Sequence, residues 1–155
     1  MLCEADIKVS WRARPRGFVA LMSLYESNYL RFLQLAGDPT RLSGTLVSRV
    51  DGDCELRLAV LEHMPYTSML TLTYLLPSSA AGSIERLPDL SLRAYHDARL
   101  LEAEEFAAQH RTRGQGVRPG ERELHQRWTR NMMLNKWLEY CAERGHRFAL
   151  QEPTG

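Results

Sequence analysis

The spacing of apolar residues changes along the chain, and each period predicts one kind of element. Between Phe18 and Ala36 the apolar residues recur at steps of three and four, which predicts an amphipathic helix. Extra leucines widen its apolar face, so we expect it to be buried on two sides; they are Leu21, Leu24, Leu30, Leu33 and Leu35. A Gly-Asp-Pro sequence at 37–39 ends the helix, because glycine suits the C-terminal cap and proline cannot continue it. Glu26 and Asn28 interrupt the apolar stretch. We expect both at its solvent edge, where such residues most often lie; the alternative is that the pair faces a pocket.

Alternation with a period of two replaces the helical pattern after residue 44 and is typical of strands. It predicts strands at 45–50, 54–62 and 66–76, separated by an Asp-Gly-Asp turn and by a His-Met-Pro break. Because such short links join them, these strands must be antiparallel neighbours.

A second alternating stretch, from Pro88 to Phe106, follows a small-residue loop at 77–83. One side of it is mostly apolar and holds Leu90, Leu92, Ala94 and His96. The other side is polar and holds Ser91, Arg93, Tyr95 and Asp97. The apolar pattern resumes at Leu100. We interpret the stretch as a strand that continues past a bend or bulge at 96–98, which brings the sheet to about five strands.

A closing helix is predicted from Glu121 to Arg144, after a glycine-rich loop at 107–120. Acidic residues suit its start and Gly145 suits its end. Its buried face is expected to hold Met133, Leu134, Trp137, Leu138 and Cys141. The fold class that follows is α+β, an antiparallel sheet of about five strands with an N-terminal and a C-terminal helix packed on one face. The other sheet face is either open or in contact with a partner.

The 155 residues suit one domain, which we place at 18–146 between a flexible Arg-rich arm at 1–17 and a tail at 147–155. A net charge of +1 argues against a nucleic-acid binder that uses its whole surface. The cysteines are far apart and form no Cys-x-x-Cys pair, so neither a disulfide framework nor a zinc site is expected. No apolar run reaches the length of a membrane span, and charges interrupt the N-terminal segment. We therefore expect a cytoplasmic protein that uses no cofactor, metal or membrane.

Acid–base side chains gather at Tyr95, His96 and Asp97. Neighbouring residues on a strand point to opposite faces, so Tyr95 and Asp97 can share a face that His96 joins only through a bulge. Glu62 and His63 could also meet His96 and Asp97 across neighbouring strands and form a two-His, two-carboxylate metal site, although the histidines show no metal-ligand spacing in the sequence. These five residues are the candidate catalytic residues of a hydrolase-like enzyme. The alternative is a polar bend that ties down backbone groups.

Arginines gather on the glycine-rich loop and the start of the closing helix, which is the most uneven charge distribution in the chain. We call this set, with a neighbouring tryptophan, the basic edge; its candidate ligand-binding residues are Arg111, Arg113, Arg118, Arg122, Arg127 and Trp128. Guanidinium groups bind phosphate and carboxylate groups bidentately, and Trp128 could stack on a base. The loop lacks the Lys-Ser/Thr ending of a P-loop. The alternative is a solvated edge without a ligand.

Several stretches of the chain resemble one known family. The sequence Tyr-His-Asp-Ala at 95–98 is similar to the signature of the YqiB-like family of bacterial proteins of unknown function. Residues 21–29 resemble the first helix of that family, 61–68 its Glu-x-x-x-Tyr-Thr-Thr segment, and the chain from 124 onward its closing helix. In place of the family's Arg-Tyr-Asp-Tyr-Pro-Asn-like stretch, the chain has Arg-Gly-Gln-Gly-Val-Arg-Pro-Gly at 113–120. The resemblance implies no established activity.

We therefore interpret the protein as a small binding or regulatory module that binds a partner protein or an anionic ligand through the basic edge at 111–130. One alternative is a hydrolase-like enzyme with its site at 95–97. A second alternative is RNA binding through the basic edge, which the nearly balanced charge does not favour.

Overall fold

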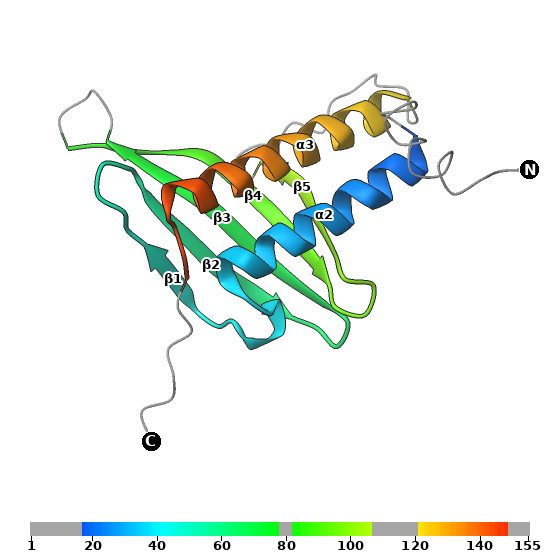
Figure 1. Ribbon diagram of the computed structural model, residues 1–155, viewed down its shortest axis with the longest axis horizontal. Coiled ribbons are helices and arrows are strands. Elements are labelled where there is room, and N and C mark those ends of the chain that lie inside the picture. Colours follow the sequence, from blue (N-terminus) through cyan, green and yellow to red (C-terminus); the bar gives the residue numbers. More distant parts are fainter. Residues whose placement is uncertain (1–16, 78–81, 107–120, 149–155) are drawn as a thin grey trace, which may run out of the picture.

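The structure, a computed structural model, describes residues 17–77, 82–106 and 121–148, and its elements follow the predicted order (Figure 1). Both helices have the predicted bounds: α2 is Phe18–Ala36 and α3 is Glu121–Arg144. The strands are β1 Thr45–Ser48, β2 Glu55–His63, β3 Thr67–Pro77, β4 Ile84–Tyr95 and β5 Leu100–Phe106, and a 3-10 helix, η1, spans Pro39–Arg41.

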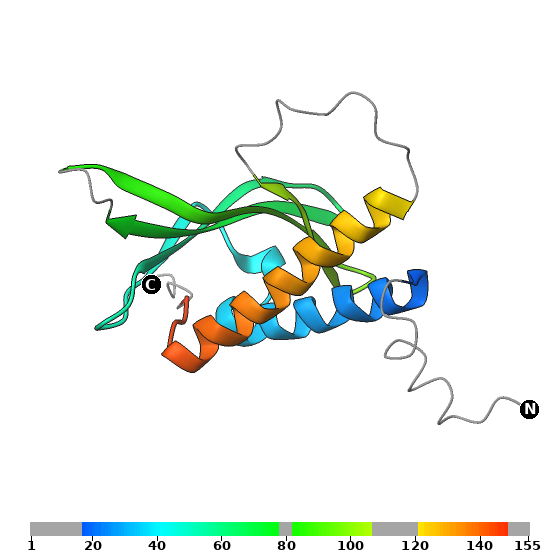
Figure 2. The ribbon, with the colours of Figure 1, turned by 90° about the horizontal axis from the view of Figure 1, so that it is seen from above.

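The strands form one antiparallel sheet in the order β1-β2-β3-β4-β5, so each strand pairs with its neighbours in sequence. The sheet arches over α2 and α3, which lie side by side on one of its faces (Figure 2). This arrangement confirms the predicted α+β class with both helices on one face. We call the helix-covered side of the sheet the inner face and the opposite side the outer face.

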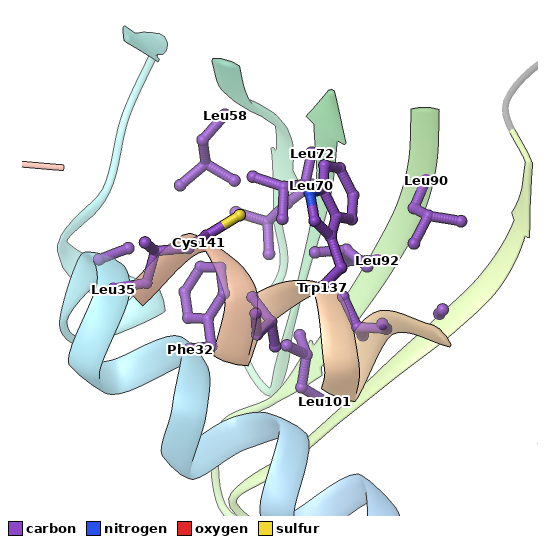
Figure 3. Close-up of a cluster of buried hydrophobic side chains, with 14 of the residues drawn as sticks. Phe32, Leu35, Leu58, Leu70, Leu72, Leu90, Leu92, Leu101, Trp137 and Cys141 are labelled. Atoms are coloured by element: carbon purple, nitrogen blue, oxygen red, sulfur yellow. The ribbon is translucent and has the colours of Figure 1, made fainter. Parts of the chain in front are cut away.

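Leucines from four strands fill the inner face and meet apolar side chains of the helices (Figure 3). Leu58, Leu72 and Leu92 have no exposed surface, and Phe32 of α2 is equally buried. Trp137 of α3 is 6% exposed, which confirms its predicted core position. Full burial of one such aliphatic side chain contributes about 1.5–3 kcal/mol, so this layer is the main source of stability.

The free edge of β5 is closed by asparagine side chains from both helices. Asn131 of α3 accepts from the Ala103 N–H at 2.8 Å and donates to the Ala103 carbonyl at 3.3 Å, so its amide takes the place of a neighbouring strand. Asn28 of α2 donates to the Leu101 carbonyl at 3.2 Å and to Asn131 Oδ1 at 3.2 Å. Asn135 donates in turn to Asn28 Oδ1 at 3.0 Å. Because unpaired strand edges recruit other chains, this network protects the sheet from edge-to-edge association.

The expectation that Asn28 lies at the solvent edge is therefore wrong. Its side chain is fully buried, because its amide finds carbonyl and amide partners on β5 and α3. Glu26 is exposed, as expected.

The predicted strand through residues 96–98 is instead two strands joined by a tight turn. β4 ends at Tyr95 and β5 begins at Leu100, and these two residues pair across the turn. Arg99 has a φ of 56°, in the left-handed region that asparagine and glycine usually occupy. The turn contains neither residue, so the sequence carried no signal for a reversal here. β4 also begins earlier than the predicted strand at Pro88.

Candidate functional site

Tyr95, His96 and Asp97, the predicted catalytic trio, point to different places. Tyr95 lies on the outer face, where its hydroxyl donates to the Glu102 carboxylate. His96 turns to the other side, and its Nε2 lies 2.9 Å from Ser68 Oγ. Asp97 is exposed in the turn between β4 and β5. The three residues are therefore separated, because the strand ends at Tyr95 and the turn that follows directs His96 and Asp97 to different places.

A β-bulge at Leu61 brings His63 to the same end of the sheet as His96. The register between β2 and β3 shifts there, so Leu61 is 62% exposed and His63 pairs with Ser68 of β3. His63 Nδ1 lies 2.5 Å from Ser68 Oγ, which is also the hydroxyl that contacts His96. The two histidines, at the ends of β2 and β4, thus contact the same Ser68 hydroxyl of β3, which lies between those strands. Glu62 pairs with Met69 and faces outward instead, so the predicted carboxylates do not join the histidines.

The backbone carbonyl of Leu42 fixes the direction of this hydrogen-bond chain. A carbonyl only accepts, so His63 Nε2, at 2.7 Å, must donate to it. The neutral ring then accepts at Nδ1 from the Ser68 hydroxyl, and Ser68 accepts from the Nε2–H of His96. His96 Nδ1 is left as a buried acceptor without a partner among the described residues. Ser68 has no exposed surface, so in this conformation the chain ties strand ends together and presents no nucleophile.

A second polar cluster joins the end of α3 to the hairpin between β1 and β2. His146 Nδ1 lies 2.9 Å from Ser48 Oγ, and His146 Nε2 lies 2.8 Å from Asp53 Oδ2. The Arg147 N–H donates to the same Ser48 oxygen at 3.1 Å. Phe148, in the predicted tail, is 5% exposed. These residues come from two segments that lie far apart in the sequence and form no sequence motif, so sequence patterns carried no signal for this cluster.

Hydrogen bonds hold Asp53 in its ionised form. Its Oδ1 accepts from the Cys54 N–H at 2.8 Å, and its Oδ2 accepts from the Tyr74 hydroxyl at 3.2 Å as well as from His146. Burial alone would raise the pKa of Asp53, but these bonds outweigh it and hold that pKa below its ordinary value. Cys141 Sγ lies 3.4 Å from the Tyr74 hydroxyl, and burial raises the pKa of the thiol to about 11. The Cys141 thiol is therefore neutral at neutral pH.

No helix covers the outer face in the part of the chain that the structure describes (Figure 2). Its centre is a row of β3 side chains that alternate with the buried leucines; they are Thr67, Met69, Thr71 and Thr73. Ala59 of β2 and Ser91 of β4 pair with Thr71 on its two sides. The middle of the outer face, formed by Ala59, Thr71 and Ser91, is therefore uncharged.

Ion pairs surround this uncharged centre. On β2, Arg57 Nη2 lies 2.8 Å from Glu55 Oε2. On the opposite side, Arg93 Nε of β4 lies 2.7 Å from Glu104 Oε1 of β5. The rim of the outer face is thus charged, and Arg57 and Arg93 there each have a carboxylate partner.

The rim meets both helices at the edge of β5. Burial, followed by the hydrogen bond to Glu102, raises the pKa of Tyr95 to about 12, so its hydroxyl stays protonated. Arg127 of α3 forms an ion pair with Glu123 at 2.7 Å. Arg127 and Glu102 also lie beside the buried hydroxyl of Tyr25, and burial and the Glu102 carboxylate raise the pKa of Tyr25. The Arg127 side chain is therefore engaged within the protein.

Only part of the basic edge lies within the described residues. Arg122 is exposed, Trp128 is partly buried, and Arg127 forms the ion pair with Glu123. Outside the described residues lie Arg111, Arg113 and Arg118. Across the described ranges, no group of three or more His, Cys, Asp or Glu side chains is placed to hold a metal ion.

Comparisons with known proteins agree on one family. A family model described as "Protein of unknown function (DUF1249)" matches residues 31–147. The proteins named "Uncharacterized protein YqiB" of Escherichia coli strains K12 and O157:H7 are each 29% identical over 131 residues, which cover 83% of this chain and 90% of theirs. These matches confirm the resemblance found in the sequence. No solved structure matches the chain. Within the described residues, neither helix is long and apolar enough to cross a membrane.

Proposed function

The chain belongs to the DUF1249 family of proteins of unknown function, and we propose that it is a small cytoplasmic module that binds a partner protein on the outer face of its sheet. The observation that carries the proposal is the composition of that face, with an uncharged centre around Thr71 and ion pairs at its rim. Protein–protein interfaces have this anatomy, because charged residues are depleted at their core and polar groups form the rim.

The existing ion pairs favour a protein partner over a small anion. A guanidinium group that already has a carboxylate partner must give it up before it binds a phosphate, whereas an intact pair suits the polar rim of a protein interface. Arg57 and Arg93 form such pairs on the outer face, and Arg127 forms one at the basic edge. An anionic ligand or RNA would have to rely on other arginines.

The side chains of the outer face are also held in place before any partner arrives. Thr73 Oγ1 donates to Asp89 Oδ1 at 2.7 Å, and Arg93 is fixed by Glu104 at 2.7 Å. Ordering mobile side chains on binding costs conformational entropy and weakens the complex. A surface whose side chains are already ordered loses less of this entropy on association. This supports docking on the sheet without a conformational change.

Photo-cross-linking in cells of the source organism tests the proposal. The photoreactive residue p-benzoylphenylalanine would replace Thr71 on the outer face or, as a control, Ser23 on the exposed side of α2. We expect a discrete adduct with one protein at position 71 and none at position 23, with the circular dichroism spectrum of the parent in both variants. The same adducts at both positions, or no adduct at 71, would contradict the proposal.

A further inference from the structure

The two edges of the sheet differ in how they are closed. The amide of Asn131 covers the edge at β5, whereas β1 forms the opposite edge, where the described part of the chain supplies no further strand (Figure 1). We propose that β1 is a dimerisation edge, on which a second copy of this chain adds its own β1 as an antiparallel strand. This proposal does not depend on the partner of the outer face.

The ladder between β1 and β2 shows which backbone groups of β1 face outward. The Gly44 carbonyl accepts from the Val60 N–H at 2.9 Å, so position 44 is hydrogen-bonded to β2. Hydrogen-bonded and non-hydrogen-bonded positions alternate along an antiparallel strand, so positions 46 and 48 face β2 as well. The N–H and carbonyl groups of Thr45 and Val47 therefore point away from β2. Among the described residues, no hydrogen bond reaches these groups from that side.

The outward groups of Thr45 and Val47 are complementary to those of a second copy. In an antiparallel pair with its twofold axis at Leu46, Thr45 of each copy lies opposite Val47 of the other. Each of these two pairs exchanges two N–H···O=C hydrogen bonds, which uses all the outward groups of both strands. A self-complementary register of this kind is what a twofold dimer requires, because the same surface serves both copies.

The side chains of β1 also suit such a junction. The strand Thr-Leu-Val-Ser contains no charged residue and no proline, which are the residues that usually block an open edge. Leu46 is only partly buried, at the place where the leucine layer of the core ends. The twofold axis sets it opposite Leu46 of the second copy, with about 4.5–5.5 Å between the two β-carbons. The apolar layer of the inner face therefore continues across the junction.

The charges near β1 favour antiparallel pairing, which places the start of one strand beside the end of the other. Arg41 precedes the strand, Asp51 follows it, and both are exposed. The other charges nearby have partners within the chain: Arg49 pairs with Glu55 at 2.8 Å, and Asp38 accepts from the Thr40 N–H. Each end of the junction therefore receives unlike charges, from Arg41 of one copy and Asp51 of the other.

The short length of β1 sets the strength of the dimer. The two Thr45–Val47 pairs supply four backbone hydrogen bonds, two from each pair, whereas a typical stable interface has about ten direct hydrogen bonds. We therefore expect a reversible dimer with a dissociation constant between about 10 μM and about 300 μM.

Sedimentation velocity of the full-length protein from about 1 μM to about 1 mM tests the proposal, and we expect the parent to change from monomer to dimer over this range. Val47→Pro removes an N–H that the monomer does not use, and an edge strand tolerates proline where its N–H faces solvent. This variant should stay monomeric throughout. Val47→Thr is the matched control, because it keeps both the N–H and the branched β-carbon, and should dimerise like the parent. A parent that stays monomeric, or a folded Val47→Pro that dimerises like the parent, overturns the proposal.

Amide hydrogen exchange followed by NMR needs no variant that could fail to fold. The N–H groups of Thr45 and Val47 face solvent in the monomer and are hydrogen-bonded in the dimer. Their exchange should slow as the protein is concentrated, by about tenfold when nine-tenths of the chain is dimeric. The Leu46 N–H, which faces β2, should exchange slowly at every concentration. Exchange at Thr45 and Val47 that does not change with concentration overturns the proposal.

Discussion

Replacing Asn131 by leucine would open the free edge of β5 while keeping the branched shape of the side chain. Asn131 uses its full hydrogen-bonding capacity: Oδ1 accepts from the Ala103 N–H and from Asn28, and Nδ2 donates to the carbonyls of Ala103 and Arg127. The side chain has no exposed surface, so water does not replace the lost partners.

The cost of Asn131→Leu follows from the groups that it leaves unpaired. The N–H and the carbonyl of Ala103 lose the side chain that pairs with them at this edge, and each buried orphan group costs about 1–3 kcal/mol. Asn28 keeps its hydrogen bond to the Leu101 carbonyl at 3.2 Å, so its loss of the Asn131 partner adds little to the destabilisation. We therefore expect the free energy of unfolding to fall by about 2–6 kcal/mol, a large share of the ~5–15 kcal/mol typical of a domain.

Urea unfolding followed by circular dichroism measures this change. Lys136→Leu, at an exposed position of the same helix, is the control and should shift the free energy of unfolding by less than about 0.5 kcal/mol. The reasoning is refuted if Asn131→Leu also stays within about 0.5 kcal/mol of the parent, because the amide would then not be needed to close the edge.

Three other experiments test separate parts of the structure. Trp137→Ala should lower the free energy of unfolding by about 3–5 kcal/mol in urea, whereas a loss of a few tenths would place the residue outside the core. Nitrogen-15 NMR of the histidine rings should show His63 and His96 as Nε2–H tautomers, and an Nδ1–H tautomer at His63 would reverse the hydrogen-bond chain through Ser68. The pKa of Asp53 is lowered by folding, so its ionised form stabilises the fold above its unfolded pKa and this contribution is lost as pH falls through the folded value. Thermal melting between about pH 5 and about pH 3 should therefore drop more steeply for the parent than for Asp53→Asn, and equal slopes would contradict this.

The helices and most strands could be predicted because local pattern and tertiary packing agree. The steps of three and four in α2 end at Gly37, whose φ of 79° requires the glycine that the sequence supplies. The reversal at 96–99 could not be predicted in the same way, because Arg99 adopts a left-handed conformation that its side chain does not favour.

Polar residues were harder to place than apolar ones. His63 and His96 both reach Ser68 because β3 lies between β2 and β4, but the bulge at Leu61 that turns His63 towards Ser68 has no sequence marker. Burial of Asn28 depends on partners from β5 and α3 that only the folded chain brings together. The same holds for His146, whose partners lie in the β1–β2 hairpin.

Docking of a partner on the outer face is tested most directly by affinity purification with quantitative mass spectrometry. Tagged parent, Thr71→Arg and Ser23→Arg would be recovered from the same cells; both variants add one guanidinium group, at the centre of the outer face and on the exposed side of α2 respectively. We predict that a protein enriched by the parent and by Ser23→Arg falls about tenfold or more with Thr71→Arg, because a charge at the centre of an interface is poorly tolerated. Equal recovery of every enriched protein by a folded Thr71→Arg variant would contradict docking on this face.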